Sequence, residues 1–324
     1  MLATHLASQE NATEKSPWNF SLVTDFAYYP RADFIKSGDA TSHFAPTTGA
    51  YSGIEFRITG NASYTIPIPF GENPLVKGNT LVFNSALELS PVSIMPKFSI
   101  TFTPIAFLVF TAGGNFGTGW FMPGLNVQGM SLLKDPMKEE MVDAYENLTP
   151  FKHFYVDAFI DGTFQFDVAA LWPGDWHHIV TLANFTAHYI TLTGVPNGAV
   201  WGWQGTANQA NGWQYNAQFV LGYQMPRLPL SMVALNCELS GHFRADDYDQ
   251  SKYKNYNGSY MTVDMAPLMQ FSFAKHHSLL VAFYFERRRS FVEAHTSNIR
   301  EPILTQKGNE WYFRRIALSY TYTF

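Results

Sequence analysis

The sequence has almost no cysteine, few charged residues and no long apolar run. Its 324 residues include a single cysteine, Cys237, which excludes an intrachain disulfide framework and a multi-cysteine zinc or iron–sulfur site. The longest apolar run, at 104–110, falls well below the roughly 18 consecutive apolar residues of a membrane-spanning helix. The sequence therefore excludes an α-helical membrane protein.

The charge balance argues against a nucleic-acid partner. The formal net charge is -5 and the isoelectric point is about 6.0, so the basic patch that binds phosphates is missing. Charged residues make up only 15% of the chain, against roughly 25% in an ordinary soluble domain. Aromatic residues reach 16%, yet the mean hydropathy is only -0.11. Apolar and polar residues must therefore be interleaved along the chain.

The N-terminal segment shows no secretory signal peptide. Residues 1–17 lack a basic start and an apolar core of the required length. Either the protein is cytosolic, or it is an exported protein whose leader has been removed. The rest of the sequence favours export. We therefore expect residues 1–17 to be a flexible segment ahead of a single domain at 18–324, with a cleaved signal peptide that this chain does not contain.

The C-terminal segment alternates between apolar and polar residues. In WYFRRIALSYTYTF, one face carries Ile316, Leu318, Tyr320, Tyr322 and Phe324, and the residues between them are small, hydroxylated or charged. This period of two predicts a β-strand. The segment resembles the C-terminal assembly signal of the bacterial outer-membrane β-barrel (porin-like) superfamily, through Tyr320, Tyr322 and the final Phe324. The resemblance implies a transmembrane β-barrel, inserted by the barrel-assembly machinery.

Other segments test this resemblance independently. Alternating stretches of the length that crosses a bilayer, about 9–11 residues, occur at 18–28, 163–172, 213–224, 261–273 and 279–288. Several begin or end their apolar face with Trp or Tyr, as the interfacial aromatic girdles of such barrels do. The pattern predicts an all-β, antiparallel, up-and-down transmembrane barrel.

The spacing of strands and turns predicts about fourteen strands, within a range of twelve to sixteen. Tight turns are expected at Gly60-Asn61, Asp161-Gly162, 195–198, 225–229 and 274–277, because Gly, Asn and Pro favour turns. The strands are expected at 18–29, 50–60, 62–70, 79–90, 92–112, 151–160, 163–172, 176–192, 199–204, 213–224, 230–243, 259–273, 278–289 and 311–324. Segment 92–112 forms either one long strand or two. An even number places both termini at the end with tight turns.

One long insertion is expected at 113–150. Within it, residues 135–148 have a helical pattern, with Asp135 as the N-cap and Pro136 at the first helical position. Such a helix either packs on the rim of the barrel or enters the lumen as a constriction.

The polar faces of the strands should point into the lumen, because a charge on the lipid face costs about 2–4 kcal/mol near the midplane. We predict the following pore-lining residues: Asp25, Glu55, Arg57, Glu88, Lys97, Asp157, Asp167, Asp264, Glu286, Arg288 and Arg315. Acids outnumber bases among them. They form either a salt-bridged filling of a narrow barrel or the lining of a water-filled pore with a mild cation preference.

Two prolines stand out in the expected strand at 62–70. Pro67 and Pro69 both lack a backbone N–H, and residues two apart direct that group toward the same neighbouring strand. They mark either a strand end outside the bilayer or a weakened lateral seam through which an apolar molecule enters the wall.

Patterns for catalysis and metal binding are weak. His295 and Ser297 resemble the His/Ser/Asn site of outer-membrane phospholipases, but no supporting motif accompanies them. The acidic residues at 246–249 lack the Gly and Glu of a calcium loop. We therefore predict no enzymatic activity, no metal and no cofactor.

The sequence thus predicts a channel in the outer membrane of a diderm bacterium for passive passage of small hydrophilic solutes or ions. Two alternatives remain open: a barrel resembling the fatty-acid transporter family, which would move apolar molecules through a lateral opening, and a non-conducting adhesin or scaffold. Outer-membrane lipids, the barrel-assembly machinery and small solutes are the expected partners. The solute and the oligomeric state are not specified by the sequence.

Overall fold

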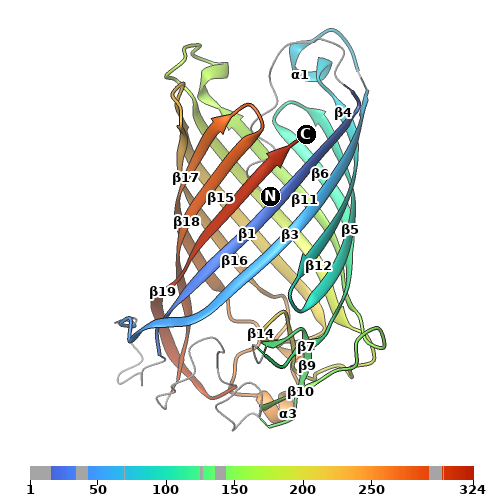
Figure 1. The fold of residues 1–324 in the computed structure, drawn as a ribbon, viewed down its shortest axis with the longest axis vertical. Helices are drawn as coiled ribbons and strands as arrows, with labels where there is room; N and C mark the ends of the chain where they lie inside the picture. The colour runs from blue at the N-terminus through green and yellow to red at the C-terminus, as the bar shows by residue number, and fades with distance from the viewer. Residues whose placement is uncertain are drawn as a thin grey trace.

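The chain folds into a closed antiparallel β-barrel whose strands run obliquely to its long axis (Figure 1). The computed structural model describes residues 16–33, 43–68, 70–124, 127–135, 144–291, 301 and 303–324. The wall consists of β1 (Trp18–Arg31), β3 (Gly49–Pro67), β4 (Thr80–Ser90), β5 (Ser93–Ile105), β6 (Leu108–Gly119), β11 (Tyr155–Asp167), β12 (Ile179–Leu192), β15 (Gly212–Gln224), β16 (Leu230–His242), β17 (Thr262–Ala274), β18 (His277–Phe291) and β19 (Gln306–Thr323).

Each strand of the wall pairs with the next one along the chain, and the first pairs with the last. The main sheet has thirteen strands among the described residues; without β2 (His43–Phe44), which lies parallel to β19 outside the ring, twelve form the barrel. Closure runs from Ser21 opposite Thr323 to Tyr28 opposite Ile316. The even number places both termini at one end, here called the terminal end; the opposite end is the loop end.

Apolar side chains cover the outside of the wall. Phe56, Phe98, Ile160 and Phe219 are all more than 40% exposed. Phe56 and Phe98 have polar residues on both sides in sequence, whose side chains lie on the other face. Exposed large apolar side chains recur on strand after strand around the ring. The polar faces therefore point into the barrel, as the alternation predicts. No helix in the described part of the chain is long and apolar enough to cross a membrane.

The predicted number of fourteen strands is not confirmed, for four local reasons. The pairs Gly60-Asn61 and Asp161-Gly162 form no turn; they lie within β3 and β11 and pair with both neighbouring strands. Segment 92–112 is two strands, β5 and β6, joined at 106–107. Segment 199–204 contains only β13 (Trp201–Trp203), which belongs to a separate small sheet.

The connections differ between the two ends of the barrel. At the terminal end, β5–β6, β15–β16 and β17–β18 are joined by short turns, and β3–β4 by a segment with the short helix α1 (Pro74–Lys77). At the loop end the connections are long, except for the two-residue turn 91–92 between β4 and β5.

A small sheet occupies the loop end (Figure 1). It contains β9 (Met130–Leu133), β10 (Tyr145–Asn147), β13 and β14 (Thr206–Gln209), in the order β10-β9-β13-β14. We call this four-stranded sheet the mouth sheet. The hairpin β7 (Phe121–Met122) and β8 (Val127–Gln128) lies beside it in sequence. The 3-10 turns η2 (Val168–Ala170) and η3 (Ala245–Asp247) and the helix α3 (Gln250–Tyr253) complete the connections.

The long insertion differs from its predicted bounds. Strand β6 continues to Gly119 and β11 begins at Tyr155, so the connection is 120–154 rather than 113–150. The predicted helix at 135–148 falls mostly on 136–143, outside the described residues. Its last turn is wrong, because Tyr145–Asn147 forms strand β10, paired with Leu133 to Ser131 of β9.

Candidate functional site: the lumen and its mouth

The predicted pore-lining residues lie on the inner faces of the strands, and ion pairs or His–Asp contacts join each of them to a group in or beside the next strand or in the strand beyond it. The pairs are Arg57–Asp25 at 2.9 Å, Arg315–Glu55 at 3.2 Å, Lys97–Glu88 at 2.6 Å, His188–Asp157 at 3.4 Å, His178–Asp167 at 2.6 Å, Arg314–Asp264 at 2.9 Å, Arg314–Glu286 at 2.6 Å and Arg288–Glu310 at 2.7 Å. All eleven predicted residues appear in this set. Whether they line an open pore stays a prediction.

Two of these residues lie near the ends of the barrel. Asp167 is the last residue of β11, where its carboxylate also accepts a hydrogen bond from the Ala169 N–H and caps η2. Arg288 lies near the loop end, where its guanidinium pairs with the fully buried Glu310 and donates to the Ala32 carbonyl. These two side chains therefore flank the region in which the other pairs are concentrated.

Strand register explains why the charges meet. Asp25 lies directly opposite Arg57, and Glu55 reaches Arg315 across β1, with Tyr29 between them. The Tyr29 hydroxyl donates to Glu55 Oε2 at 2.7 Å and accepts from Arg315 Nη1 at 2.9 Å. Side chains on directly opposed or diagonal positions of neighbouring strands are close enough to interact. The pairing therefore runs laterally along the wall.

Arg314 is an inward-facing residue that the sequence pattern misses. Strict alternation assigns it to the lipid face, opposite to its neighbour Arg315. The register shifts at this point, because Tyr284 lies opposite Arg315 while the next residue, Phe285, lies opposite Phe313. Arg314 is therefore an extra residue in a β-bulge, which turns both arginines inward. A bulge has no signature in the apolar–polar pattern.

Glu238 and His188 are also inward-facing residues, and neither is among the predicted pore-lining residues. Glu238 lies opposite Asp264 and accepts a hydrogen bond from the Asn216 amide. His188 lies on β12 beside Asp157 of β11. Both alternate with apolar residues in the expected strands, so a stricter application of the same pattern finds them. The inner face thus has more ionisable groups than the eleven predicted pore-lining residues.

Two tryptophans of the mouth sheet pack against the inner wall at the loop end. Trp201 is fully buried, and Trp203 stacks on Tyr155 of β11 with ring centroids 4.7 Å apart. Met95 of β5 and Leu192 of β12 belong to the same apolar cluster. The long connections therefore pack into the mouth of the barrel rather than projecting away from it.

Glycines on the inner face of β6 make room for this packing. A side chain at Gly117 would place its Cβ 2.9 Å from Cη2 of Trp203. At Gly119 the Cβ would lie 2.8 Å from the backbone of Gly129, which leads into the mouth sheet. Such distances are too short for any larger residue without movement of its neighbours. Gly117 and Gly119 of β6 therefore leave the space that Trp203 and Gly129 occupy.

A polar contact ties the mouth sheet to the charged wall. Gln204, at the turn between β13 and β14, donates from Nε2 to Glu88 Oε1 at 3.0 Å and to Ser93 Oγ at 2.8 Å. Its backbone has φ of 49°, in the left-handed region that is unfavourable for residues with a side chain. Glu88 thus binds Lys97 with one oxygen and the mouth sheet with the other.

A second apolar cluster covers the mouth sheet from the loop side. It includes Tyr145, Val200, Tyr248 and Tyr256, with Phe291 of β18. The Tyr248 hydroxyl donates to the carbonyl of Asn208 at 2.8 Å, and burial raises the pKa of this hydroxyl above its ordinary value. Three connections and the end of β18 thus form one packed cap at the loop end.

The region of the predicted lateral seam is only partly described. Pro67 is the last residue of β3 and lies opposite Thr80, and the ladder continues with Ile68 N donating to the Asn79 carbonyl. Thr65 N donates to the Pro17 carbonyl, so the nitrogen two residues later points past the start of β1. Pro69 lies outside the described residues. No ladder bond within the described part of the wall is lost at Pro67.

The weak catalytic and metal patterns give no assembled site. His295 and Ser297 lie outside the described residues. Asp246 pairs with Arg244, Asp247 with His242, and Asp249 caps α3. Hydrogen bonds from Ser251 lower the pKa of the Asp249 carboxyl. Within the described ranges no group of three or more His, Cys, Asp or Glu side chains is arranged to hold a metal ion.

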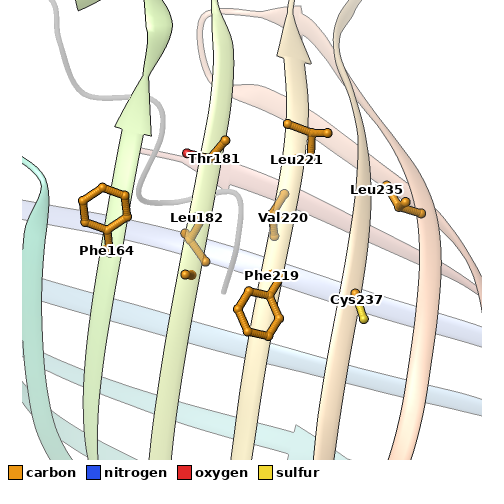
Figure 2. Close-up of a pocket in the computed structure, with 9 residues that line it drawn as sticks. Phe164, Thr181, Leu182, Phe219, Val220, Leu221, Leu235 and Cys237 are labelled. Atoms are coloured by element: carbon orange, nitrogen blue, oxygen red, sulfur yellow. The ribbon is translucent and has the colours of Figure 1, made fainter.

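A shallow apolar depression lies on the outer wall (Figure 2). Phe164, Ala183, Phe219 and Cys237 are register partners on β11, β12, β15 and β16, so large and small side chains alternate along this row. The depression follows from the small size of Ala183 and Cys237. Such a surface is typical of one that acyl chains cover, and Cys237 lies on this apolar face.

An apolar outer belt around an ion-paired interior defines a transmembrane β-barrel. Comparison with solved structures finds similar barrels. They include KdgM porin (6% identity, 94% of this chain and 99% of that chain, TM-score 0.36) and NanC porin (6%, 93% and 98%, 0.38). A third is an outer-membrane channel from Pseudomonas putida F1 (8%, 98% and 100%, 0.46). No family model matches the sequence. No curated protein matches it either.

Proposed function

We propose that this protein is an outer-membrane channel of a diderm bacterium for passive passage of small hydrophilic solutes or ions, with a mild cation preference. The observation that carries the proposal is the inner face of the barrel. Hydroxyl, amide and charged side chains recur along it on strand after strand, interrupted by one aliphatic cluster, while the outer face is apolar. A wall of twelve strands encloses more space than eight strands do, and eight already leave room for interior side chains. Outer-membrane lipids and the barrel-assembly machinery are the proposed partners.

The cation preference rests on the balance of interior charges. Four permanent cations form ion pairs with five carboxylates: Arg57, Lys97, Arg314 and Arg315 pair with Asp25, Glu55, Glu88, Asp264 and Glu286. Asp157 and Glu238 instead receive hydrogen bonds from the amides of Asn115 and Asn216. Carboxylates therefore exceed permanent cations along the wall, and a low-dielectric barrel focuses their field on the lumen.

The packed mouth sheet favours a second candidate, a non-conducting barrel that displays its cap as an adhesin or scaffold. The test is single-channel recording of the purified protein in a planar bilayer, for the full chain and for a chain in which a short Gly-Ser linker replaces 121–150. The channel proposal predicts discrete KCl currents from the full chain and a several-fold higher conductance from the shortened one. Folded barrels that conduct in neither form would establish the non-conducting alternative.

A further inference from the structure

Three carboxylates stand side by side on the inner wall. Glu238 of β16 lies opposite Asp264 of β17, which in turn lies opposite Glu286 of β18. We call these residues the carboxylate row. Like charges directly opposite each other on neighbouring strands are destabilising. The permanent cation bonded to the row is Arg314, whose Nη1 lies 2.9 Å from Asp264 Oδ2 and 2.6 Å from Glu286 Oε2.

The central carboxylate is not fully satisfied. The side chain of Asp264 is only 9% exposed, and its Oδ1 has no hydrogen-bond partner among the described residues. A buried carboxylate oxygen without a donor costs folding free energy, and more when the group is charged. An additional positive group at the row would supply that donor and reduce the repulsion along the row.

An aliphatic surface continues from the row along the same three strands. Met232 of β16, Leu268 of β17 and Ala282 of β18 form one buried cluster with Val180 of β12. These four side chains are at most 5% exposed, so the surface that the cluster presents is its half-buried border, Leu280 and Ala234. We call this group the aliphatic cluster. Leu268 lies four positions after Asp264, which corresponds to about 13 Å along a strand. Interiors of such barrels are normally polar, so aliphatic side chains here need a reason.

The opposite wall has no comparable surface. Besides the ion pairs Arg57–Asp25 and Lys97–Glu88, its inner face carries small hydroxyl and amide side chains: Ser21 on β1, Asn61 and Ser63 on β3, Asn84 on β4, and Ser99 and Thr101 on β5. These side chains bond to one another across the strands, as Asn84 does to Ser99 and Thr101. The lumen therefore has one hydrogen-bonding wall and one wall that combines negative charge with an aliphatic surface.

We propose that the lumen takes small organic cations, namely primary alkyl or aryl ammonium ions, with the ammonium group at the carboxylate row and the apolar part against the aliphatic cluster. This inference rests on the proposed channel function and names its substrate class. Charge complementarity selects an ammonium over a carboxylate of equal size. The aliphatic cluster gives a longer apolar tail more contact than a short one.

The experiment uses full-length wild-type protein in two measurements. In planar bilayers, reversal potentials between KCl and the chlorides of methyl-, ethyl-, butyl- and hexylammonium give relative permeabilities. In detergent, the thermal unfolding midpoint is measured with butylammonium and with butyrate. We expect the permeability ratio of butylammonium to methylammonium to exceed the value set by their free mobilities by several-fold. We expect butylammonium, but not butyrate, to raise the unfolding midpoint.

Matched variants assign the effect to the two surfaces. Leu280→Gln changes a half-buried side chain at the border of the aliphatic cluster and should lower the butyl-to-methyl ratio at least threefold. Val82→Asn, an aliphatic-to-polar change on the inner face of β4, should leave the ratio unchanged. Glu238→Gln should weaken the thermal stabilisation by butylammonium.

The outcomes separate the two proposals. Permeabilities that fall with tail length as free mobility does, together with no stabilisation, would overturn the organic-cation proposal while KCl currents still support the channel. Equal stabilisation by butyrate would replace it with binding of neutral or anionic amphiphiles. Selective stabilisation by butylammonium in a protein that carries no KCl current would leave the binding site standing and overturn the channel.

Discussion

Arg314 shows how a single inserted residue sets the charge of the inner wall. Because it is the extra residue of a bulge, its guanidinium faces inward and bonds Asp264 and Glu286 at once. The side chains of these two acids are only 9% and 13% exposed. Removing one partner of a buried ion pair leaves the other charge uncompensated, which is far costlier than losing a solvated pair.

We therefore predict that Arg314→Gln destabilises the barrel by about 3 kcal/mol. Chemical unfolding followed by tryptophan fluorescence, or the temperature of the heat-dependent gel shift, measures the change. Arg57→Gln is the matched control, because the Arg57 side chain is 42% exposed and its pair with Asp25 contributes about 1 kcal/mol or less. Equal effects of the two substitutions would contradict the assignment of Arg314 to a buried network.

Gly117 is a second position where one residue decides a larger arrangement. A leucine there would collide with the Trp203 indole, which fills the space above this glycine. We predict that Gly117→Leu displaces the mouth sheet and raises single-channel conductance at least twofold. Gly162→Leu in β11 is the control and should leave conductance unchanged, because a Cβ at Gly162 would lie 3.8 Å from its nearest neighbours, which are ring atoms of Phe110. Unaltered conductance in the Gly117 variant would show that the mouth sheet does not limit the current.

At the scale of elements, the alternation of apolar and polar residues predicts most strands, because each strand has one face toward lipid and the other toward the lumen. The expected strands at 213–224 and 230–243 differ from β15 and β16 by no more than one residue at either end. Turn chemistry is a weaker guide. Asp161-Gly162 favours a turn locally, yet Asp161 pairs with Thr186 and Thr111, and the ladders on both sides keep the chain extended.

Only the part of the candidate site that follows from the apolar–polar alternation of the strands could be predicted from the sequence. The alternation supplies the inward charges, since a charge on the lipid face is costly, and all eleven of them lie in ion pairs. It does not supply the bulge at Arg314 or the mouth sheet. The mouth sheet depends on contacts between connections far apart in sequence, such as Gln204 with Glu88, and a local pattern contains no information on such contacts.

The final strand is the element on which closure depends. Tyr322 lies opposite Leu22 on one side and His277 on the other, and Phe324 N donates to the Phe20 carbonyl. We predict that deleting 322–324 prevents assembly, because the edges of β1 and β18 lose their partners at the terminal end. The truncated chain should lack the heat-dependent gel shift and be degraded in the envelope. A normal shift would contradict the role of Tyr320, Tyr322 and Phe324 as an assembly signal.

At the scale of the whole molecule, the interior charges should determine ion selectivity. We predict that neutralising Asp157, Asp167 and Glu286 together, as Asn, Asn and Gln, shifts the reversal potential in a KCl gradient toward anions. The shift should shrink as ionic strength rises, because salt screens the field of the wall over about 10 Å at 0.1 M. The control is Asp246→Asn, an exposed residue of η3 outside the barrel. An unchanged reversal potential in the triple variant would indicate that these carboxylates do not face the current.

The pairing of β1 with β19 has a consequence for the time course of biogenesis. The two partners of this seam are the first and the last strand of the ring, so the ring stays open until β19 has been synthesised. Until then, the edges of β1 and of the most recently added strand present unpaired N–H and C=O groups, which favour aggregation. Loop closure over nearly the whole chain also makes the last step slow. We therefore expect the unclosed chain to aggregate far more readily than the closed barrel.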